Sequence, residues 1–215
     1  MEAIAYPERA PTVSTPALFG RVMALVALTV GFATLGVWLG RGLGGPGWFI
    51  AWLLALGCLI GLQAANARGQ TGLALALLFA FGLLIGGSVA TTINYYSETD
   101  PTAVRQAFGA TALFVAVLGA GGYAVRRDLS PLYRIAFVLL LALLGAGIVL
   151  IFVHIPGAYT VYSLAGLAIF GLYTVIDFNR LRRAGTDEAI PMAAGIFLDV
   201  FNIFLFFLRL FGRRS

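Results

Sequence analysis

Two aspartates in the last two apolar segments are the residues whose type and position are best suited to chemistry. Asp199 lies inside the apolar run 198–212 (LDVFNIFLFFLRLFG), and Asp177 lies at the end of the preceding run. A charged carboxylate at the centre of a membrane helix costs about 2.5–3.5 kcal/mol on insertion scales, so we expect it to be paired, protonated or in contact with water. Two carboxyls that met there would share a proton and titrate as a pair. Without that proton they would repel each other or bind a hard cation that prefers oxygen ligands, such as Ca²⁺.

The spacing of these residues predicts that they lie at the same depth. Asp177 and Asp199 are each 11 residues from Glu188, which lies in the turn between the two runs. In an antiparallel helical hairpin we therefore expect the two carboxyls within about one helical turn of each other in depth. Spacing does not fix helix rotation, so a solvated Asp177 and a structural Asp199, bonded to a hydroxyl or an arginine, remain alternatives. Asn202 shares a helix face with Asp199; it either extends the polar site or, as we favour, bonds a backbone carbonyl.

The composition places these residues in an integral membrane protein. The chain has 215 residues, of which 60% are hydrophobic and 11% charged, whereas a soluble domain has roughly 25% charged residues. Apolar runs of about 20 residues, long enough to cross the hydrocarbon core, lie at 17–40, 48–66, 72–94, 102–125, 132–154, 158–179 and 190–211. We predict an all-α membrane protein with seven transmembrane helices in a single domain at 17–212. A polar N-terminal segment at 1–16 precedes this domain, and a short basic tail at 213–215 follows it. The last run contains polar residues, so a re-entrant segment is the alternative there.

The loops predict helix starts and the orientation of the chain. Asp100-Pro101 and Ser130-Pro131 each have the form of an N-cap followed by proline at the first helical position. All 14 basic residues are arginine, and nine of them fall on the N-terminal side of the predicted spans. This bias favours a cytoplasmic N-terminus and an outward C-terminus. Because the arginines lie mostly in short loops, we expect the lipid bilayer as a partner and no nucleic acid.

Glycine pairs at helical spacing predict close helix contacts. Gly36/Gly40 and Gly82/Gly86 have the GxxxG spacing, which lets helix backbones approach each other in a membrane. We expect packing within the chain rather than dimerisation. With one cysteine and one histidine, no Cys/His metal cluster is expected.

Several segments together resemble the Bax inhibitor-1 family, also called the transmembrane Bax-inhibitor-motif family. The matching segments are TDEAIPMAAG with LDVFNIFLFFLRLFG (186–212), LYTVIDFNRL (172–181) and QAFGATALFVAVLGAGGYAVRRDLS (106–130). The resemblance implies a seven-helix fold with the C-terminal helix central, surrounded by the other six. It also implies that Asp177 and Asp199 are the family's paired aspartates, described as a pH sensor. Bacterial relatives are described as pH-sensitive calcium leak channels, so the resemblance implies Ca²⁺ and protons as partners. Eukaryotic relatives are described in the endoplasmic reticulum, but the short N-terminal segment and the absence of lysine favour a bacterial plasma membrane for this chain.

One feature of the resemblance is not matched cleanly. Some bacterial relatives hold the aspartate pair with an arginine at the cytoplasmic end of the second span. The ungapped match to that arginine is Asn66, and Arg68 lies two residues further on. Two residues turn a helix by about 200°, so Arg68 and Asn66 are only candidates for a latch or polar support.

We therefore predict a passive, pH-gated Ca²⁺ leak channel that is not an enzyme and has no cofactor. Asp177 and Asp199 form its gate and a candidate Ca²⁺ site. One alternative is a non-conducting regulator that binds another membrane protein, such as a protease. Another is a proton-coupled cation exchanger. An intramembrane hydrolase is a third class, but neither aspartate lies in a GxGD-type motif.

Overall fold

A computed structural model describes residues 15–153 and 155–212, and this part of the chain is built of helices. Seven of the helices are long and apolar enough to cross a membrane, which confirms the predicted all-α class. Residues 1–14 of the predicted N-terminal segment and the basic tail at 213–215 lie outside the described residues. The elements are α1 (Thr15–Leu39), η1 (Gly40–Gly42), α2 (Gly47–Ala67), α3 (Thr71–Ser88), α4 (Ala90–Thr99), α5 (Pro101–Ala124), α6 (Leu132–Phe152), α7 (Ala158–Leu181), η2 (Thr186–Glu188) and α8 (Ala189–Phe211).

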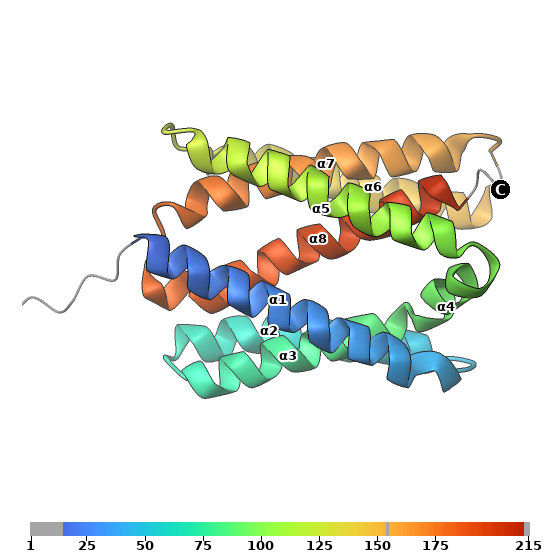
Figure 1. Ribbon diagram of the computed structural model, residues 1–215, viewed down its shortest axis with the longest axis horizontal. Coiled ribbons are helices and arrows are strands. Elements are labelled where there is room, and N and C mark those ends of the chain that lie inside the picture. The colour runs from blue at the N-terminus through green and yellow to red at the C-terminus, as the bar shows by residue number, and fades with distance from the viewer. Residues whose placement is uncertain (1–14, 154, 213–215) are drawn as a thin grey trace, which may run out of the picture.

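The C-terminal helix α8 runs through the middle of the bundle. Figure 1 shows it between a group formed by α1, α2 and α3 and a group formed by α5, α6 and α7. It packs against α7, α5, α1, α2 and α3. In an 18-residue stretch of this span 56% of the residues are buried, whereas the share for α6 is 11%. The predicted central position is confirmed, and the continuous 23-residue helix excludes the re-entrant alternative.

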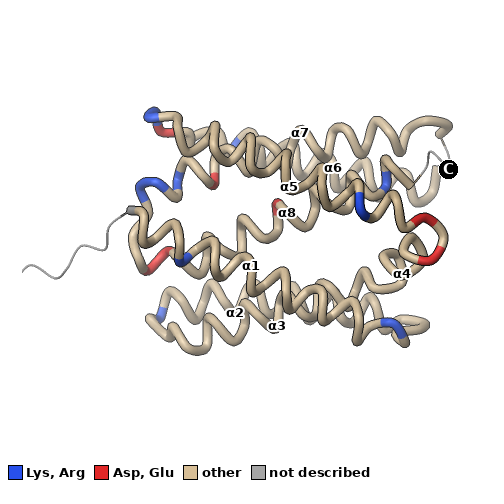
Figure 2. The backbone as a smooth tube through the Cα atoms, viewed as in Figure 1, with Lys and Arg blue, Asp and Glu red and all other residues tan. Residues whose placement is uncertain are grey.

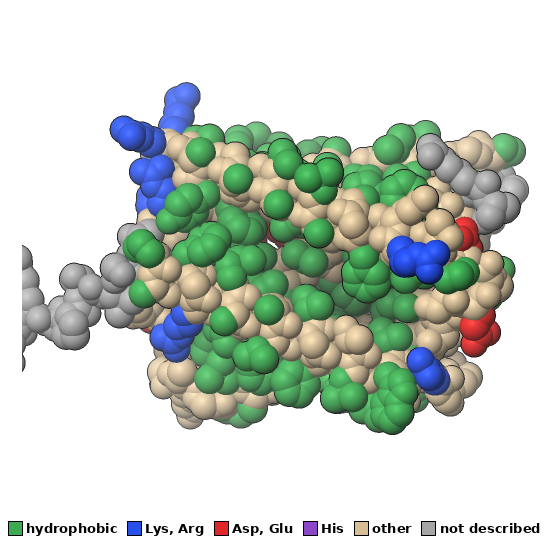
Figure 3. All heavy atoms as spheres, viewed as in Figure 1, with side chains coloured by type: hydrophobic (Ala, Val, Ile, Leu, Met, Phe, Trp, Pro, Cys, Tyr) green, Lys and Arg blue, Asp and Glu red, His purple; other side chains and the backbone are tan. Residues whose placement is uncertain are grey.

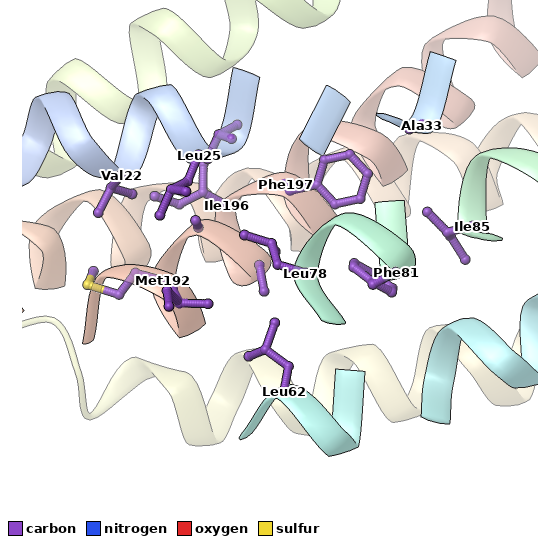
Figure 4. Packing of buried hydrophobic residues seen from close by; sticks show 14 of the residues in the cluster. Val22, Leu25, Ala33, Leu62, Leu78, Phe81, Ile85, Met192, Ile196 and Phe197 are labelled. Carbon is purple, nitrogen blue, oxygen red and sulfur yellow. The ribbon is translucent and has the colours of Figure 1, made fainter. Parts of the chain in front are cut away.

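Apolar side chains fix α8 against the first group of helices. Figure 4 shows Leu78 and Phe81 of α3 meeting Ile196 and Phe197 of α8, with Leu62 of α2 closing the cluster. The rings of Phe81 and Phe197 form an edge contact with centroids 5.6 Å apart. Lipid tails are as apolar as these side chains, so the close van der Waals fit supplies the attraction in a membrane.

Glycines bring α1 and α3 into backbone contact. A Cβ atom on Gly86 would lie 2.0 Å from Ala33 O, and one on Gly36 would lie 2.0 Å from Leu83 O. No side chain larger than hydrogen fits at either position. The GxxxG pairs of the two helices therefore pack against each other, as predicted for contacts within the chain.

The predicted third span, 72–94, was wrong beyond residue 88. α3 ends at Ser88, whose hydroxyl donates to Ile85 O at 2.7 Å, and the polar sequence ATTINYYSET forms the separate helix α4. Asp100 caps α5 as predicted, because its carboxylate accepts a hydrogen bond of 3.0 Å from Ala103 N–H. The predicted Ser130 cap was wrong by one residue: α6 begins at Leu132, with Pro131 at the N-cap position.

Charged residues gather at the two ends of the bundle, as Figure 2 shows. We call one of them the arginine-rich end, defined by Arg126 and Arg127 after α5 and by Arg182 and Arg183 after α7. The α7–α8 connection lies at this end.

Candidate functional site

A polar cavity lies among α2, α6, α7 and α8. Its volume is about 410 Å³, and both Asp177 of α7 and Asp199 of α8 line it. The two side chains are nearly buried, with 9% and 4% of their surface exposed. The structure therefore brings the two predicted site residues to one cavity.

Asp177 is held by contacts with α6 and α8. The Tyr133 hydroxyl, at the start of α6, donates a hydrogen bond to Asp177 Oδ1. The other oxygen, Oδ2, lies against α8, where a Cβ atom on Gly195 would be 2.9 Å away. Gly195 is one helical turn before Asp199, so it lies on the same face of α8. A larger residue at this position would displace the Asp177 carboxyl from the face that carries Asp199.

Asp199 is less well satisfied than its partner. Its Oδ2 atom is buried and has no hydrogen-bond partner among the described residues. The nearby Thr174 hydroxyl donates to Phe170 O at 2.8 Å. The predicted clasp between the two carboxyls is therefore not formed through Asp199 Oδ2. A buried oxygen costs about 1–3 kcal/mol when it stays unsatisfied, so Oδ2 is the atom at which a proton, water or a cation in the cavity would be stabilised.

The cavity offers a metal ion few charged oxygen ligands. Ca²⁺ takes about 6–8 oxygen ligands, and the side-chain oxygens here come from Asp177, Asp199, Tyr133, Tyr173 and Gln63. Among the described residues no group of three or more His, Cys, Asp or Glu side chains could hold a metal ion. The carboxylates of Asp177 and Asp199 are therefore the charged oxygen donors at this cavity.

The candidate latch residues of α2 do not line the cavity. Arg68 is the exposed C-cap residue of α2, and Asn66 is half-buried. The α2 residue that lines the cavity is Gln63, one turn before Asn66. The positive charge at the cavity comes instead from Arg180 of α7, which forms an ion pair with Glu188.

Asn202 does not extend the polar site. Its side-chain amide donates to Leu198 O at 2.8 Å, within its own helix, and it does not line the cavity. The backbone bond that we favoured from the sequence is the one that the structure shows.

A buried asparagine that sequence reasoning missed fixes the arginine-rich end of α7. Asn179 is 1% exposed, and its amide donates to the carbonyls of Gly122, Val125 and Arg127 at 3.2, 2.7 and 3.1 Å. Its Oδ1 atom accepts from Leu129 N–H at 3.0 Å. One side chain thus satisfies backbone groups of the segment that joins α5 to α6, and α6 carries Tyr133.

Tyr133 was also missed, although the sequence contains a signal for it. Tyr133 and Asp177 are separated by 44 residues and are symmetric about Ile155, in the turn between α6 and α7. The hairpin argument that pairs Asp177 with Asp199 therefore also pairs Asp177 with Tyr133. Gln63 carries no comparable signal, because α2 is not adjacent in sequence to either aspartate.

Aromatic rings close the cavity on the side away from the arginine-rich end. Phe170 lines the cavity, and its ring packs against Phe206 of α8 with centroids 5.9 Å apart. Phe206 in turn lies over Gly166 of α7, where a Cβ atom would be 2.3 Å from the ring. The cavity is therefore separated from the opposite end of the bundle by a layer of packed rings.

Comparisons with known proteins agree with this architecture. The chain is 27% identical over 165 residues to an uncharacterised membrane protein of Streptococcus pyogenes serotype M1, covering 73% of this chain and 71% of that protein. It is 26% identical over 147 residues to an uncharacterised protein of Helicobacter pylori strain J99, covering 68% and 64%. The sequence profile of the family described as inhibitor of apoptosis-promoting Bax1 matches residues 15–215, nearly the whole chain. The chain therefore belongs to the Bax inhibitor family.

Proposed function

We propose that this protein is a pH-sensitive cation leak channel whose physiological ion is Ca²⁺. The observation that carries the proposal is that Asp177 and Asp199, from the two helices of one hairpin, line a single cavity inside a membrane-spanning bundle. Ionisable residues inside membrane helices are expensive and are typical of ion and proton pathways. In this proposal the two aspartates form the gate, and the cation passes without a resident metal site or a cofactor.

Protonation supplies the switch. A proton on one carboxyl removes the repulsion between the two groups and leaves the hairpin closed. With both groups ionised, the two like charges repel each other, and little water is present to screen the repulsion between two nearly buried side chains. That repulsion favours separation of the two helices. Separation of α7 from α8 would part the rings of Phe170 and Phe206, which meet across the same hairpin.

Calcium flux into liposomes tests the gate. We expect purified protein to conduct Ca²⁺ more at high pH than at low pH. The variants Asp177→Asn and Asp199→Asn should flatten this dependence, because an amide does not ionise in this range. The matched control is Asp128→Asn, an aspartate in the exposed α5–α6 connection, which should keep the wild-type pH profile. An unchanged pH response in both cavity variants would contradict the proposal.

The same assay separates the competing functions. Flux that saturates and requires a proton gradient would identify a proton-coupled exchanger. No flux at any pH would favour a non-conducting regulator that binds another membrane protein.

The proposed setting is a bacterial plasma membrane with the arginine-rich end in the cytoplasm. Most described arginines lie at this end, and short cytoplasmic loops are enriched in basic residues. Labelling of single cysteines placed in the α5–α6 and α4–α5 connections, in intact cells of a Cys58→Ser background, tests the orientation. Access from outside to the α4–α5 connection alone is the expected result.

A further inference from the structure

A second cavity, an apolar groove, lies on the opposite side of α8 from the aspartates. It has a volume of about 930 Å³, and α1 and α5 form its walls while α8 forms its floor. Figure 1 shows α8 behind the space between α1 and α5, and Figure 3 shows apolar side chains along both edges of this face. On α1 the lining extends from Pro16 to Val37, a length of about 31 Å at 1.5 Å per residue. This length matches the hydrocarbon thickness of a bilayer, about 30 Å.

The chemistry of the groove suits a hydrocarbon chain. Its lining includes the hydroxyl-bearing residues Thr34, Ser97 and Thr111. Each threonine hydroxyl donates to a carbonyl of its own helix, at 2.9 and 2.7 Å, so neither threonine needs a polar ligand. The neighbouring surface of α5 is exposed and apolar, with Leu113 66% and Val117 61% exposed. In a membrane-spanning protein such a surface faces lipid, and the groove is open to the same environment.

The dimensions favour an acyl chain over a protein helix. A volume of about 930 Å³, which is the space open to the centres of water-sized spheres, spread over about 31 Å leaves a groove roughly 9 Å across once the water radius of about 1.4 Å is added. A helix with its side chains is about 10–12 Å across, which requires roughly 80 Å² or more. A transmembrane helix of a partner would not enter the groove without separating α1 from α5.

The arginine-rich end of the groove has the features of a headgroup site. Phe19, Tyr123 and Phe178 surround this end of the groove, with ring centroids 5.5 Å apart for Phe19 and Tyr123 and 6.3 Å for Phe19 and Phe178. Arg182 follows Phe178 by one helical turn and donates to Val125 O at 3.4 Å, directly after α5. A tyrosine such as Tyr123 beside basic residues is typical of the membrane interface.

The arginines at this end differ in how their charge is balanced. In the described part of the chain the ion pairs at this end involve Arg180 and Arg183. The charges of Arg126, Arg127 and Arg182 have no such carboxylate partner there. Basic clusters between transmembrane helices at the cytoplasmic side bind anionic lipid headgroups.

We infer that the groove binds an anionic glycerophospholipid, with one acyl chain between α1 and α5 and the phosphate at Arg126, Arg127 and Arg182. The same lipid chain lies against Val200 and Phe204 of α8, on the back of the helix that carries Asp199. The site is defined by its own residues and does not depend on conduction.

Native mass spectrometry of the detergent-purified protein tests the tail site. We expect phosphatidylglycerol to stay bound in preference to phosphatidylcholine with the same acyl chains. Ala116→Trp fills the groove from the α5 wall and should reduce the bound fraction at least fivefold. Val117→Trp, the next residue on the same helix, does not line the groove and is the matched control. Thermal unfolding shows whether each variant is folded, and Ala120→Leu replaces Ala116→Trp if the latter is not.

Charge variants test the headgroup site. Each arginine near an anionic lipid surface is worth roughly a fivefold change in binding, so Arg182→Gln should lower the preference for phosphatidylglycerol by about that factor. Arg134→Gln is the control, because α6 carries this residue at the same end but contributes nothing to the groove. Equal lipid retention in Ala116→Trp and Val117→Trp would overturn the proposal. So would a protein dimer that Ala116→Trp abolishes while lipid binding is unaffected, since a second copy would then occupy the groove.

Discussion

Two helix pairs in this bundle are packed in opposite ways, and the contrast separates scaffold from working part. α1 and α3 meet through glycines so closely that a Cβ atom on Gly36 or Gly86 would lie 2.0 Å from a backbone oxygen. α7 and α8 also meet through a glycine, Gly195, but the group that fills the space is the Asp177 carboxyl. Beside it lie a cavity of about 410 Å³ and the unpartnered Oδ2 atom of Asp199.

The difference indicates which helix contacts can rearrange at low energetic cost. Packed apolar contacts have one low-energy arrangement, and a small displacement loses attraction on both sides. A buried carboxylate without a full set of partners loses little when its surroundings move and gains if the move brings in water or a cation. We therefore expect damage to the α1–α3 contact to prevent folding, and damage around the α7–α8 contact to change stability or gating in smaller steps.

The largest effect is expected for Gly86→Leu. Overpacking in a core costs about 1–3 kcal/mol and occasionally more, and here the obstacle is the backbone oxygen of Ala33, which no rotamer change can move. The variant should give no monodisperse protein on size-exclusion chromatography. The control is Gly31→Leu on α1, where no atom lies within 4 Å of the added Cβ. Normal yield of Gly86→Leu would show that α1 and α3 are not held together as tightly as this contact implies.

A smaller effect is expected for Asn179→Ala, which leaves the α7–α8 contact intact but frees the α5–α6 connection. The change leaves up to three carbonyls and one N–H without their partner, and unsatisfied buried groups cost about 1–3 kcal/mol. We expect a loss of about 2–3 kcal/mol in the free energy of unfolding, measured by denaturant titration in mixed micelles. Asn202→Ala removes a single bond within α8 and should cost about 0.6 kcal/mol, the average for such bonds in membranes. Equal losses for the two variants would mean that Asn179 does not fix the loop.

Tyr133→Phe tests the α7–α8 region more directly, because it removes the hydroxyl that bonds Asp177. Hydrogen bonds within membrane proteins are worth about 0.6 kcal/mol and at most about 1.7, so we expect a loss near 1 kcal/mol. We also expect a change in the pH midpoint of Ca²⁺ flux, because one oxygen of the proposed gate loses its donor. Tyr162→Phe, on a ring that packs against Phe206 away from the cavity, should leave the midpoint unchanged. A Tyr133→Phe variant with the wild-type pH midpoint would show that Tyr133 is not part of the proposed gate.

Much of the scaffold and half of the site could be predicted from the sequence. Apolar length alone locates the membrane helices, because backbone polar groups must be satisfied internally in lipid. Symmetry about Glu188 places Asp177 and Asp199 at one depth, since both helices rise by the same distance per residue. The same rule would have found Tyr133.

The rest depends on rotation and on tertiary contacts that spacing does not encode. Whether α2 offers Gln63 or Arg68 to the cavity depends on how the helix is turned, and this is set by packing against α3 and α8. The end of α3 at Ser88 is a different case, because the residues of α4 that follow, ATTINYYSET, are polar and could have indicated that the span stops before residue 94. Asn179 is followed by basic residues, a pattern typical of a solvated helix end. It is buried and hydrogen-bonded only because the α5–α6 connection packs against it.

The smallest effect on stability is expected for Asp128→Asn, in the exposed part of the α5–α6 connection. A hydrogen bond from the backbone N–H of Ser130, with help from Arg183 at 2.6 Å, lowers the pKa of Asp128 below its usual value of 3.8. A carboxyl whose pKa is lower in the folded state stabilises the fold above its unfolded pKa, and this contribution is lost as the pH falls through the folded pKa. The wild-type protein should therefore melt slightly above Asp128→Asn at pH 7, and the two melting temperatures should converge below about pH 4. Because the side chain is exposed, the difference in melting temperature should also shrink in high salt. A difference that is the same at every pH would show that the ionised Asp128 carboxylate does not stabilise the α5–α6 connection.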